Sequence, residues 1–191
     1  MNYTDFFISE VNPLAGFFEG KADIEKTMAF LHYEKGGNVQ KLIFSIKYYG
    51  NKKLAHLLGR MAARELKPCM ENWPAVDFLV PVPLHPKRLR ERGYNQSEWI
   101  CLGLASVLNI PVNTKSLLRN KYTKTQTRKD MEERSLNVRG AFVINDTETL
   151  QGRHVLLVDD VLTSGSTILA CAEALLTIPN IRVSVLAIAK A

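Results

Sequence analysis

The stretch His154-Val-Leu-Leu-Val-Asp-Asp-Val-Leu-Thr-Ser-Gly-Ser-Thr167 carries more chemistry than any other part of the chain. The apolar run 155–158 predicts a short strand buried on both faces, as in the middle of a parallel sheet. Asp159 and Asp160 follow it, at the carboxyl end where open α/β sheets bind ligands. A hydroxyl-rich turn then leads into a helical pattern over residues 168–176. The stretch therefore predicts a βα unit with two carboxylates at its ligand-binding edge.

The turn after the acid pair predicts an anion site. A helix amino end offers unpaired N–H groups and a partial positive charge, and a glycine lets a ligand approach the backbone. An aspartate pair can accept hydrogen bonds from a ribose diol and orient Mg²⁺. We therefore expect Asp159 and Asp160 to be catalytic and metal-orienting residues. The residues expected to hold a 5′-phosphate are Thr163, Ser164, Gly165, Ser166 and Thr167.

An apolar strand, two acids and a Thr-x-Gly-x-Thr loop resemble the phosphoribosyl pyrophosphate signature of type I phosphoribosyltransferases. One alternative is an ordinary βα unit whose acids only cap the turn. Another is a response-regulator receiver domain, but its acid pair stands near the start of the chain, whereas only 31 residues follow Asp160 here. A P-loop is excluded, because the sequence has no Gly-x-x-x-x-Gly-Lys run.

Length and composition are typical of one globular domain with a full core: 191 residues, 46% hydrophobic and 23% charged. No apolar run is long enough to span a membrane, and the first residues do not form a basic region followed by an apolar one. We therefore expect a cytoplasmic protein with no membrane partner. Cys69, Cys101 and Cys171 include no Cys-x-x-Cys pair, so neither a disulfide framework nor a zinc site is predicted.

Positive charge is concentrated in two segments. Residues 84–92 have a net charge of +3 and residues 115–139 of +5, while the whole chain has +6. Such a distribution suits a polyanionic substrate, and nucleic acid would favour the same distribution.

The first basic segment follows a second predicted strand, residues 77–80, which Pro81 and Pro83 end. We interpret residues 84–96 as a loop that leads into a helix from Ser97, with Asn95 and Glu98 at the spacing of a capping box. Arginine side chains match phosphate oxygens with two parallel hydrogen bonds, which makes Arg88 and Arg92 candidates for binding pyrophosphate. The alternative is a solvated basic turn.

Strands and helices alternate along the chain, which predicts an α/β fold with a parallel, doubly wound sheet. Residues 1–25 are expected to be an irregular segment held by aromatic side chains, and residues 26–191 to form the domain. Within it, residues 113–139 are a long polar stretch with few large apolar residues. Such a stretch inside a compact domain is usually either disordered or a hood or lid that closes over a charged substrate.

Further motifs resemble those of the ComF family, over roughly residues 28–191. They are Ile46-Lys-Tyr-x-Gly50, Pro81-Val-Pro-Leu-His85, Arg88-x-x-x-Arg92-Gly-x-Asn95-Gln, Arg119-x-x-x-Thr123-x-x-Gln126 and Arg134-x-x-Asn137-Val-x-Gly-Ala-Phe142. Members are phosphoribosyltransferase-like proteins tied to DNA uptake, often labelled amidophosphoribosyltransferases. The resemblance places Thr123, Gln126 and Arg134 in the hood.

The resemblance implies transfer of the phosphoribosyl group from phosphoribosyl pyrophosphate, with Mg²⁺, to an unidentified nitrogen nucleophile. The alternative is a non-catalytic DNA-uptake adaptor that keeps the fold and binds single-stranded DNA or a competence helicase. Interleaved bases and aromatics, at Lys121-Tyr122 and Arg92-Gly-Tyr94, are compatible with stacking on nucleobases.

Three departures from the related families qualify these expectations. The four-cysteine zinc module with which ComF proteins usually begin is missing from the sequence. The chain begins Met1-Asn2-Tyr3, without the catalytic cysteine of amidophosphoribosyltransferases, so we expect no glutamine hydrolysis. Thr163 stands where purine-salvage enzymes have a carboxylate that serves as the base for the nucleobase, which makes purine salvage a poor fit.

Overall fold

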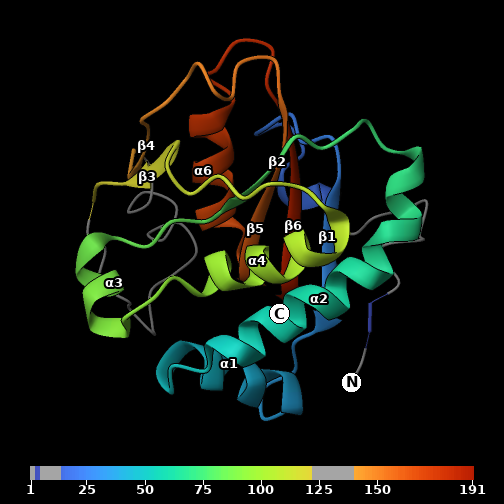
Figure 1. Cartoon of the computed structure of the whole chain (residues 1–191), viewed down its shortest axis with the longest axis vertical. Coiled ribbons are helices and arrows are strands. Elements are labelled where there is room, and N and C mark those ends of the chain that lie inside the picture. Colours follow the sequence, from blue (N-terminus) through green and yellow to red (C-terminus); the bar gives the residue numbers. More distant parts are fainter. Residues whose placement is uncertain (1–2, 5–13, 122–139) are drawn as a thin grey trace.

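Four parallel strands form the central sheet, in the order β1-β6-β5-β2 (Figure 1). The computed structural model describes residues 3–4, 14–121 and 140–191. The strands of this sheet are β1 (Thr27–His32), β2 (Phe78–Pro81), β5 (His154–Leu162) and β6 (Arg182–Lys190). The helices are α1 (Asn38–Tyr48), α2 (Lys52–Cys69), α3 (Pro86–Arg92), α4 (Gln96–Leu108) and α6 (Ser166–Leu175). Short 3-10 turns are η1 (Ala15–Phe17) and η2 (Met70–Asn72).

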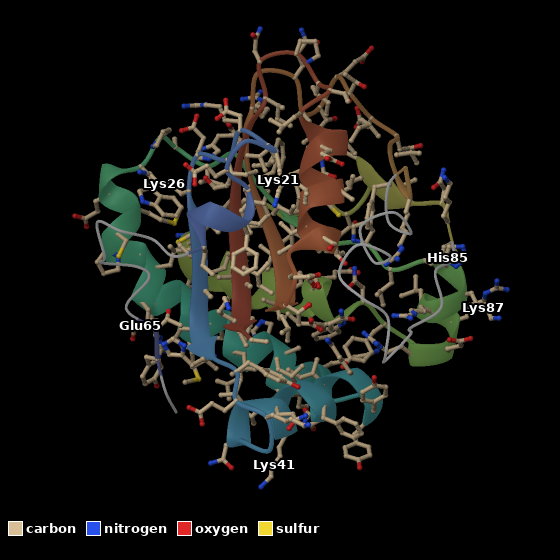
Figure 2. All side chains as sticks on the ribbon, turned by 180° about the vertical axis from the view of Figure 1, so that it is seen from behind. Lys21, Lys26, Lys41, Glu65, His85 and Lys87 are labelled. Carbon is tan, nitrogen blue, oxygen red and sulfur yellow. The ribbon has the colours of Figure 1, made fainter. Side chains whose placement is uncertain are left out.

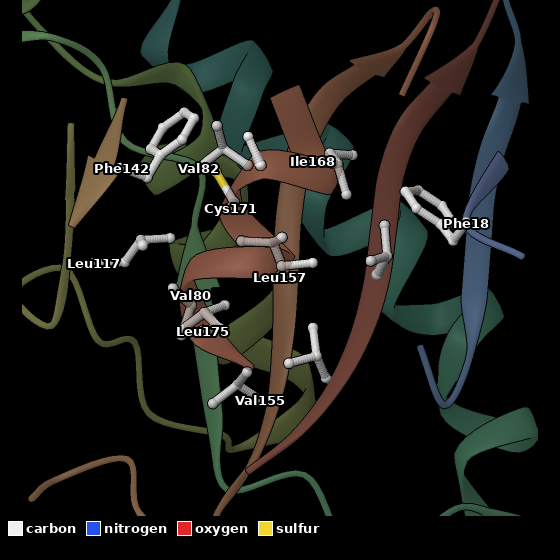
Figure 3. Packing of buried hydrophobic residues seen from close by; sticks show 14 of the residues in the cluster. Phe18, Val80, Val82, Leu117, Phe142, Val155, Leu157, Ile168, Cys171 and Leu175 are labelled. Atoms are coloured by element: carbon white, nitrogen blue, oxygen red, sulfur yellow. The ribbon is translucent and has the colours of Figure 1, made fainter. Parts of the chain in front are cut away.

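Helices cover both faces of the sheet. The side chains of each strand alternate between these faces, so one strand contributes to two cores. Val155 and Leu157 of β5 belong to the core cluster that includes α6 (Figure 3). Leu156 and Val158 belong to the cluster that includes α1, α2 and α4. All four side chains are fully buried. The predicted doubly wound parallel sheet is therefore confirmed.

Helices α2 and α4 touch through their backbones. A Cβ atom added at Gly59 would lie 2.2 Å from the carbonyl oxygen of Ile100, and one added at Gly103 would lie 2.1 Å from that of His56. No side chain fits at these distances, so glycine at both positions allows the helices to approach so closely. This contact fixes α4, whose first turn reaches the sheet edge where we expect the site.

Strand β5 is longer than the predicted run 155–158, and the acid pair lies within it rather than after it. Its ladder with β2 ends where Pro81 pairs with Val158. The ladder with β6 continues on the other side to Leu162. The acids therefore begin where β2 stops, which leaves one side of β5 open at its carboxyl end.

A second, two-stranded sheet pairs β3 (Leu117–Arg119) with β4 (Phe142–Ile144) in antiparallel fashion. The sequence analysis treated residues 113–139 as a polar stretch without a strand, and β3 shows that this was wrong for residues 117–119. Only Leu117 of the three β3 residues is buried, so the pattern was too short to detect. The two-stranded sheet lies beside α6 (Figure 1), and Leu117 and Phe142 share a core cluster with β5 residues such as Leu157.

Both edges of the parallel sheet are partly paired. Tyr3 forms an antiparallel bridge with Leu31 of β1, and Val112 forms a parallel bridge with Leu79 of β2. Within the first 25 residues, Leu14 and Phe18 are buried in the core, and residues 5–13 lie outside the described part. No helix in the described residues is long and apolar enough to cross a membrane.

Candidate functional site

The acid pair is buried at the open end of β5. Asp159 is 8% exposed and Asp160 is 3% exposed. Oδ1 of Asp159 accepts a hydrogen bond from the Ser97 hydroxyl (3.1 Å) and another from the Asp160 backbone N–H (2.8 Å). Ser97 lies in the first turn of α4, whose start is capped by the Asn95 side chain, as the sequence predicted. Helix α4 thus orients the first acid.

Asp160 is held from the opposite side by α1. Its Oδ1 lies 3.0 Å from Nζ of Lys47, in an ion pair between largely buried side chains. Its Oδ2 is buried and has no hydrogen-bond partner among the described residues. A buried carboxylate oxygen without a donor is costly, so this atom requires a donor from outside the described residues.

Burial and neighbouring charges shift the pKa values of the site residues. Burial, and then the negative charge of Asp160, raise the pKa of Asp159 to about 7. Burial alone would lower the pKa of Lys47, but its attraction to Asp160 and Asp159 outweighs this, so that its pKa is raised. Lys47 is therefore a permanent cation beside the acids.

The hydroxyl-rich turn lies between β5 and α6, as predicted. Gly165 is the N-cap residue of α6, with φ of +73°, and it has no side chain that could accept a hydrogen bond from the first N–H groups of the helix. A Cβ at this position would lie 3.3 Å from Cδ1 of Phe17. Glycine is therefore required by the backbone as well as suited to ligand access. The Ser164 and Ser166 hydroxyls are hydrogen-bonded to each other at 3.0 Å.

The basic segment after β2 was predicted to be a loop but is the short helix α3. Its helix signals are a proline at the first position, His85 as the cap that accepts from the Lys87 N–H (3.1 Å), and Gly93 in a left-handed conformation at its end. None of its residues is buried. Side chains such as Lys87 point away from the body of the protein (Figure 2).

Both candidate pyrophosphate residues act electrostatically on residues that also interact with the acid pair. The charge of Arg92 acts on Lys47, the partner of Asp160. Burial lowers the pKa of Arg119, and Arg88 and Asp159 also act on this guanidinium. The Arg92 guanidinium donates to the buried Gln96 side chain at the start of α4. Residues from α3 and β5 thus converge on one edge of the sheet. The predicted hood residues Thr123, Gln126 and Arg134 lie outside the described residues.

Two residues of the site were missed by the sequence reasoning. Lys47 lies within the Ile46-Lys-Tyr-x-Gly50 motif, which was quoted without a role. Ser97 follows the capping residue Asn95 directly, and a hydroxyl in the first turn of a helix at a ligand-binding edge could have been included. Neither contact with the acids could be predicted from local spacing, because both join distant parts of the chain.

Comparison with known proteins identifies the same region. A family model described as phosphoribosyl transferase domain matches residues 103–187. The DNA utilization protein YhgH of Salmonella typhi is 32% identical over 137 residues, which is 71% of this chain and 60% of that protein. Competence protein F of Haemophilus influenzae is 33% identical over 131 residues, covering 68% of this chain and 56% of the relative. The chain belongs to the ComF family.

ComF membership and the parallel sheet confirm the predicted type I phosphoribosyltransferase fold. The match spans about 60% of the length of the relatives. A solved adenine phosphoribosyltransferase from Leishmania donovani is 11% identical, with a TM-score of 0.47, over 85% of this chain and 83% of that one. A likeness at this level carries no information on the substrate.

Proposed function

We propose that this ComF protein binds phosphoribosyl pyrophosphate with Mg²⁺ and transfers the phosphoribosyl group to a nitrogen nucleophile. The observation that carries the proposal is the buried Oδ2 of Asp160, which has no donor among the described residues. A ribose hydroxyl is such a donor. The amino end of α6, which begins at Ser166, would bind the 5′-phosphate of the same ligand.

In the proposed reaction, the nitrogen attacks the anomeric carbon and the bond from this carbon to the pyrophosphate oxygen breaks. The electron pair leaves with pyrophosphate, and the nitrogen releases its proton to solvent. Asp159 and Asp160 would hold the ribose hydroxyls, and their charge would stabilise the positive charge that develops on the ring. Arg88 and Arg92 would bind the pyrophosphate.

The acid pair fits the proposed cofactor Mg²⁺. This ion prefers oxygen ligands, keeps several waters and commonly combines one or two carboxylates with substrate phosphates. Asp159 and Asp160 would orient it, through water where Lys47 already occupies Oδ1 of Asp160. Bound Mg²⁺ would neutralise the leaving pyrophosphate. The described residues contain no group of three or more His, Cys, Asp or Glu that could hold a metal.

Calorimetric titration of phosphoribosyl pyrophosphate with Mg²⁺ tests the binding proposal. Wild type should bind and the double variant Asp159→Asn, Asp160→Asn should not. A matched control is Asp77→Asn, because Asp77 lies at the opposite end of β5, beside His154. Equal affinity of wild type and the double variant would overturn the assignment. Release of pyrophosphate on addition of amines or nucleobases would show transfer.

A second candidate function, nucleic-acid binding, is favoured by a different surface. Residues 35–64 contain seven basic residues and no acidic one, a third basic segment that the sequence reasoning overlooked. On it, Phe44, Tyr48 and Tyr49 are 48%, 62% and 77% exposed and form one ring cluster. Exposed aromatic rings among cations are typical of surfaces that stack single-stranded bases.

Tyr94, which the sequence suggested for stacking on nucleobases, is not exposed for such a contact. Tyr94 is 4% exposed and its hydroxyl donates to the Ile46 carbonyl, so its ring is part of the core. Tyr122 lies outside the described residues. Titration of a fluorescent single strand at several salt concentrations would test the candidate, with Phe44→Ser, Tyr48→Ser as the variant. Competition by phosphoribosyl pyrophosphate would show whether the two ligands share a site.

A further inference from the structure

The ion pair between Lys47 and Asp160 has no role in the proposed reaction so far. Its two atoms lie 3.0 Å apart, and the side chains are 26% and 4% exposed. It joins α1 to the carboxyl end of β5 in the parallel sheet. Such a pair differs from a surface salt bridge, because a buried carboxylate that loses its cation is left without compensation.

Lys47 is held in place by the fold. Its neighbour Ile46 is fully buried, and the Ile46 carbonyl accepts the Tyr94 hydroxyl from the α3–α4 connection. Lys52, just after α1, lies over the rings of Tyr94 and Trp99 at 5.4 and 5.6 Å. The end of α1 is thus fixed against the elements that carry Arg92 and Ser97, so the ammonium group has a defined position.

The contact leaves the two oxygens of Asp160 with different tasks. Oδ1 is neutralised by Lys47, whereas Oδ2 is buried and has no donor among the described residues. A bound divalent ion often has this neutralising task at a pair of adjacent carboxylates. Here an ammonium group of the chain itself occupies that place, and Oδ2 stays available as a hydrogen-bond acceptor.

We propose that Lys47 is a positioning residue that replaces a protein-bound divalent cation at Asp160, so that the ribose 5-phosphate half of the substrate binds without Mg²⁺. This inference rests on the proposed function and assigns Lys47 and Mg²⁺ to different parts of the substrate. Lys47 and the α6 turn serve the ribose phosphate, while Mg²⁺, which the acids orient through water, serves the pyrophosphate. Lys47 acts through Asp160 and does not touch the reacting atoms.

The test is calorimetric titration with ribose 5-phosphate in EDTA and, separately, in Mg²⁺. Wild type should bind equally well, within about twofold, in both solutions. Lys47→Met should bind at least about tenfold more weakly in EDTA, the factor typical of a lost hydrogen bond to a charged group. Lys47→Arg should recover much of the affinity. The matched control is Lys41→Met, because Lys41 lies exposed on the same helix and points away from the protein (Figure 2).

A double variant separates positioning from folding. If Lys47 acts through Asp160, Lys47→Met combined with Asp160→Asn should bind ribose 5-phosphate no more weakly than Asp160→Asn alone. This double variant removes the carboxylate that Lys47 pairs with, so it stays informative if Lys47→Met alone fails to fold.

Two results would overturn the inference. One is wild-type binding of ribose 5-phosphate in Mg²⁺ but not in EDTA; the other is unchanged affinity in Lys47→Met. If phosphoribosyl pyrophosphate with Mg²⁺ still binds in the same protein, only the inference fails. If neither ligand binds in either solution, the proposed function fails with it.

Discussion

Helices α3 and α4 follow each other in the chain, yet the protein uses them in opposite ways. Helix α4 is packed against α2 through Gly103, and its first turn fixes Asp159 through Ser97. Helix α3 has no buried residue and carries Arg88 and Arg92. The comparison indicates that one half of the candidate site is built on the core, while the other half is presented from an exposed helix. Substitutions should therefore separate stability from binding.

The largest effect should come from the packed helix. In Gly103→Ala, the new methyl group would meet the His56 carbonyl at 2.1 Å, so α2 and α4 must separate. We expect a loss of about 3 kcal/mol or more in unfolding free energy, measured by urea denaturation. Gly16→Ala is the control, because a Cβ there meets no atom within 4 Å. Equal stability of the two variants would contradict the close contact.

The second effect concerns the acid that α4 orients. Because its pKa is raised to about 7, folded Asp159 keeps a proton that the unfolded chain releases near pH 4. Unfolding free energy should therefore fall as pH rises from about 4 to about 7. Asp159→Asn keeps an oxygen that can accept from Ser97 and should be more stable than wild type at pH 8, by about 1–3 kcal/mol.

Urea denaturation at pH 4, 6 and 8 measures this difference. It should be smallest at pH 4 and grow with pH. Asp146→Asn is the control, because hydrogen bonds from Thr149 lower the pKa of Asp146 and give the opposite dependence on pH. A difference between wild type and Asp159→Asn that does not change with pH would count against a buried, proton-retaining carboxylate.

The exposed helix should show the reverse behaviour. Arg88→Gln should weaken binding of phosphoribosyl pyrophosphate by about tenfold, the loss expected for a hydrogen bond to a charged group. Binding of ribose 5-phosphate and stability should change little, because no residue of α3 is buried. Arg90→Gln is the matched control: its guanidinium folds back toward the Pro86 carbonyl (3.4 Å). Equal losses in both variants would indicate a general charge effect.

The smallest effect on stability should come from the aromatic cluster of α1. Phe44→Ser with Tyr48→Ser removes side chains that are about half exposed or more. Since surface substitutions usually change stability by no more than about 0.5 kcal/mol, thermal melting should be nearly unchanged. A large loss of stability would mean that this cluster supports the fold and is not a free binding surface.

The sequence predicted those structural features that depend on residues close together in the chain. Residues 155–158 are apolar because both sheet faces are covered, Pro81 ends a strand, and Asn95 caps a helix; each was predicted correctly. The acid pair and the hydroxyl turn followed from their place between a predicted strand and a predicted helix. The type I fold followed from the same residues.

Other features depend on contacts between distant residues. The length of β5 is set by β6, which pairs with it as far as Leu162. The role of Gly103 depends on α2, and the contact of Lys47 with Asp160 joins the first helix to the fifth strand. Helix α3 is different, because its proline, cap and glycine were visible in the sequence. Because the segment is strongly basic, it was interpreted as a loop, and these three helix signals were not used.

The pairing of β1 with β6 determines when the sheet can be completed during synthesis. Strand β1 has no other neighbour in the parallel sheet, and its register begins with Thr27 opposite Val185. Met28 and Ala29 must therefore wait, with one strand edge unpaired, until residues 182–190 have been made. Closing so long a loop is slow, and apolar strands with open edges are prone to aggregate in the meantime. Nascent chains of this protein are thus expected to depend on chaperones until β6 is released.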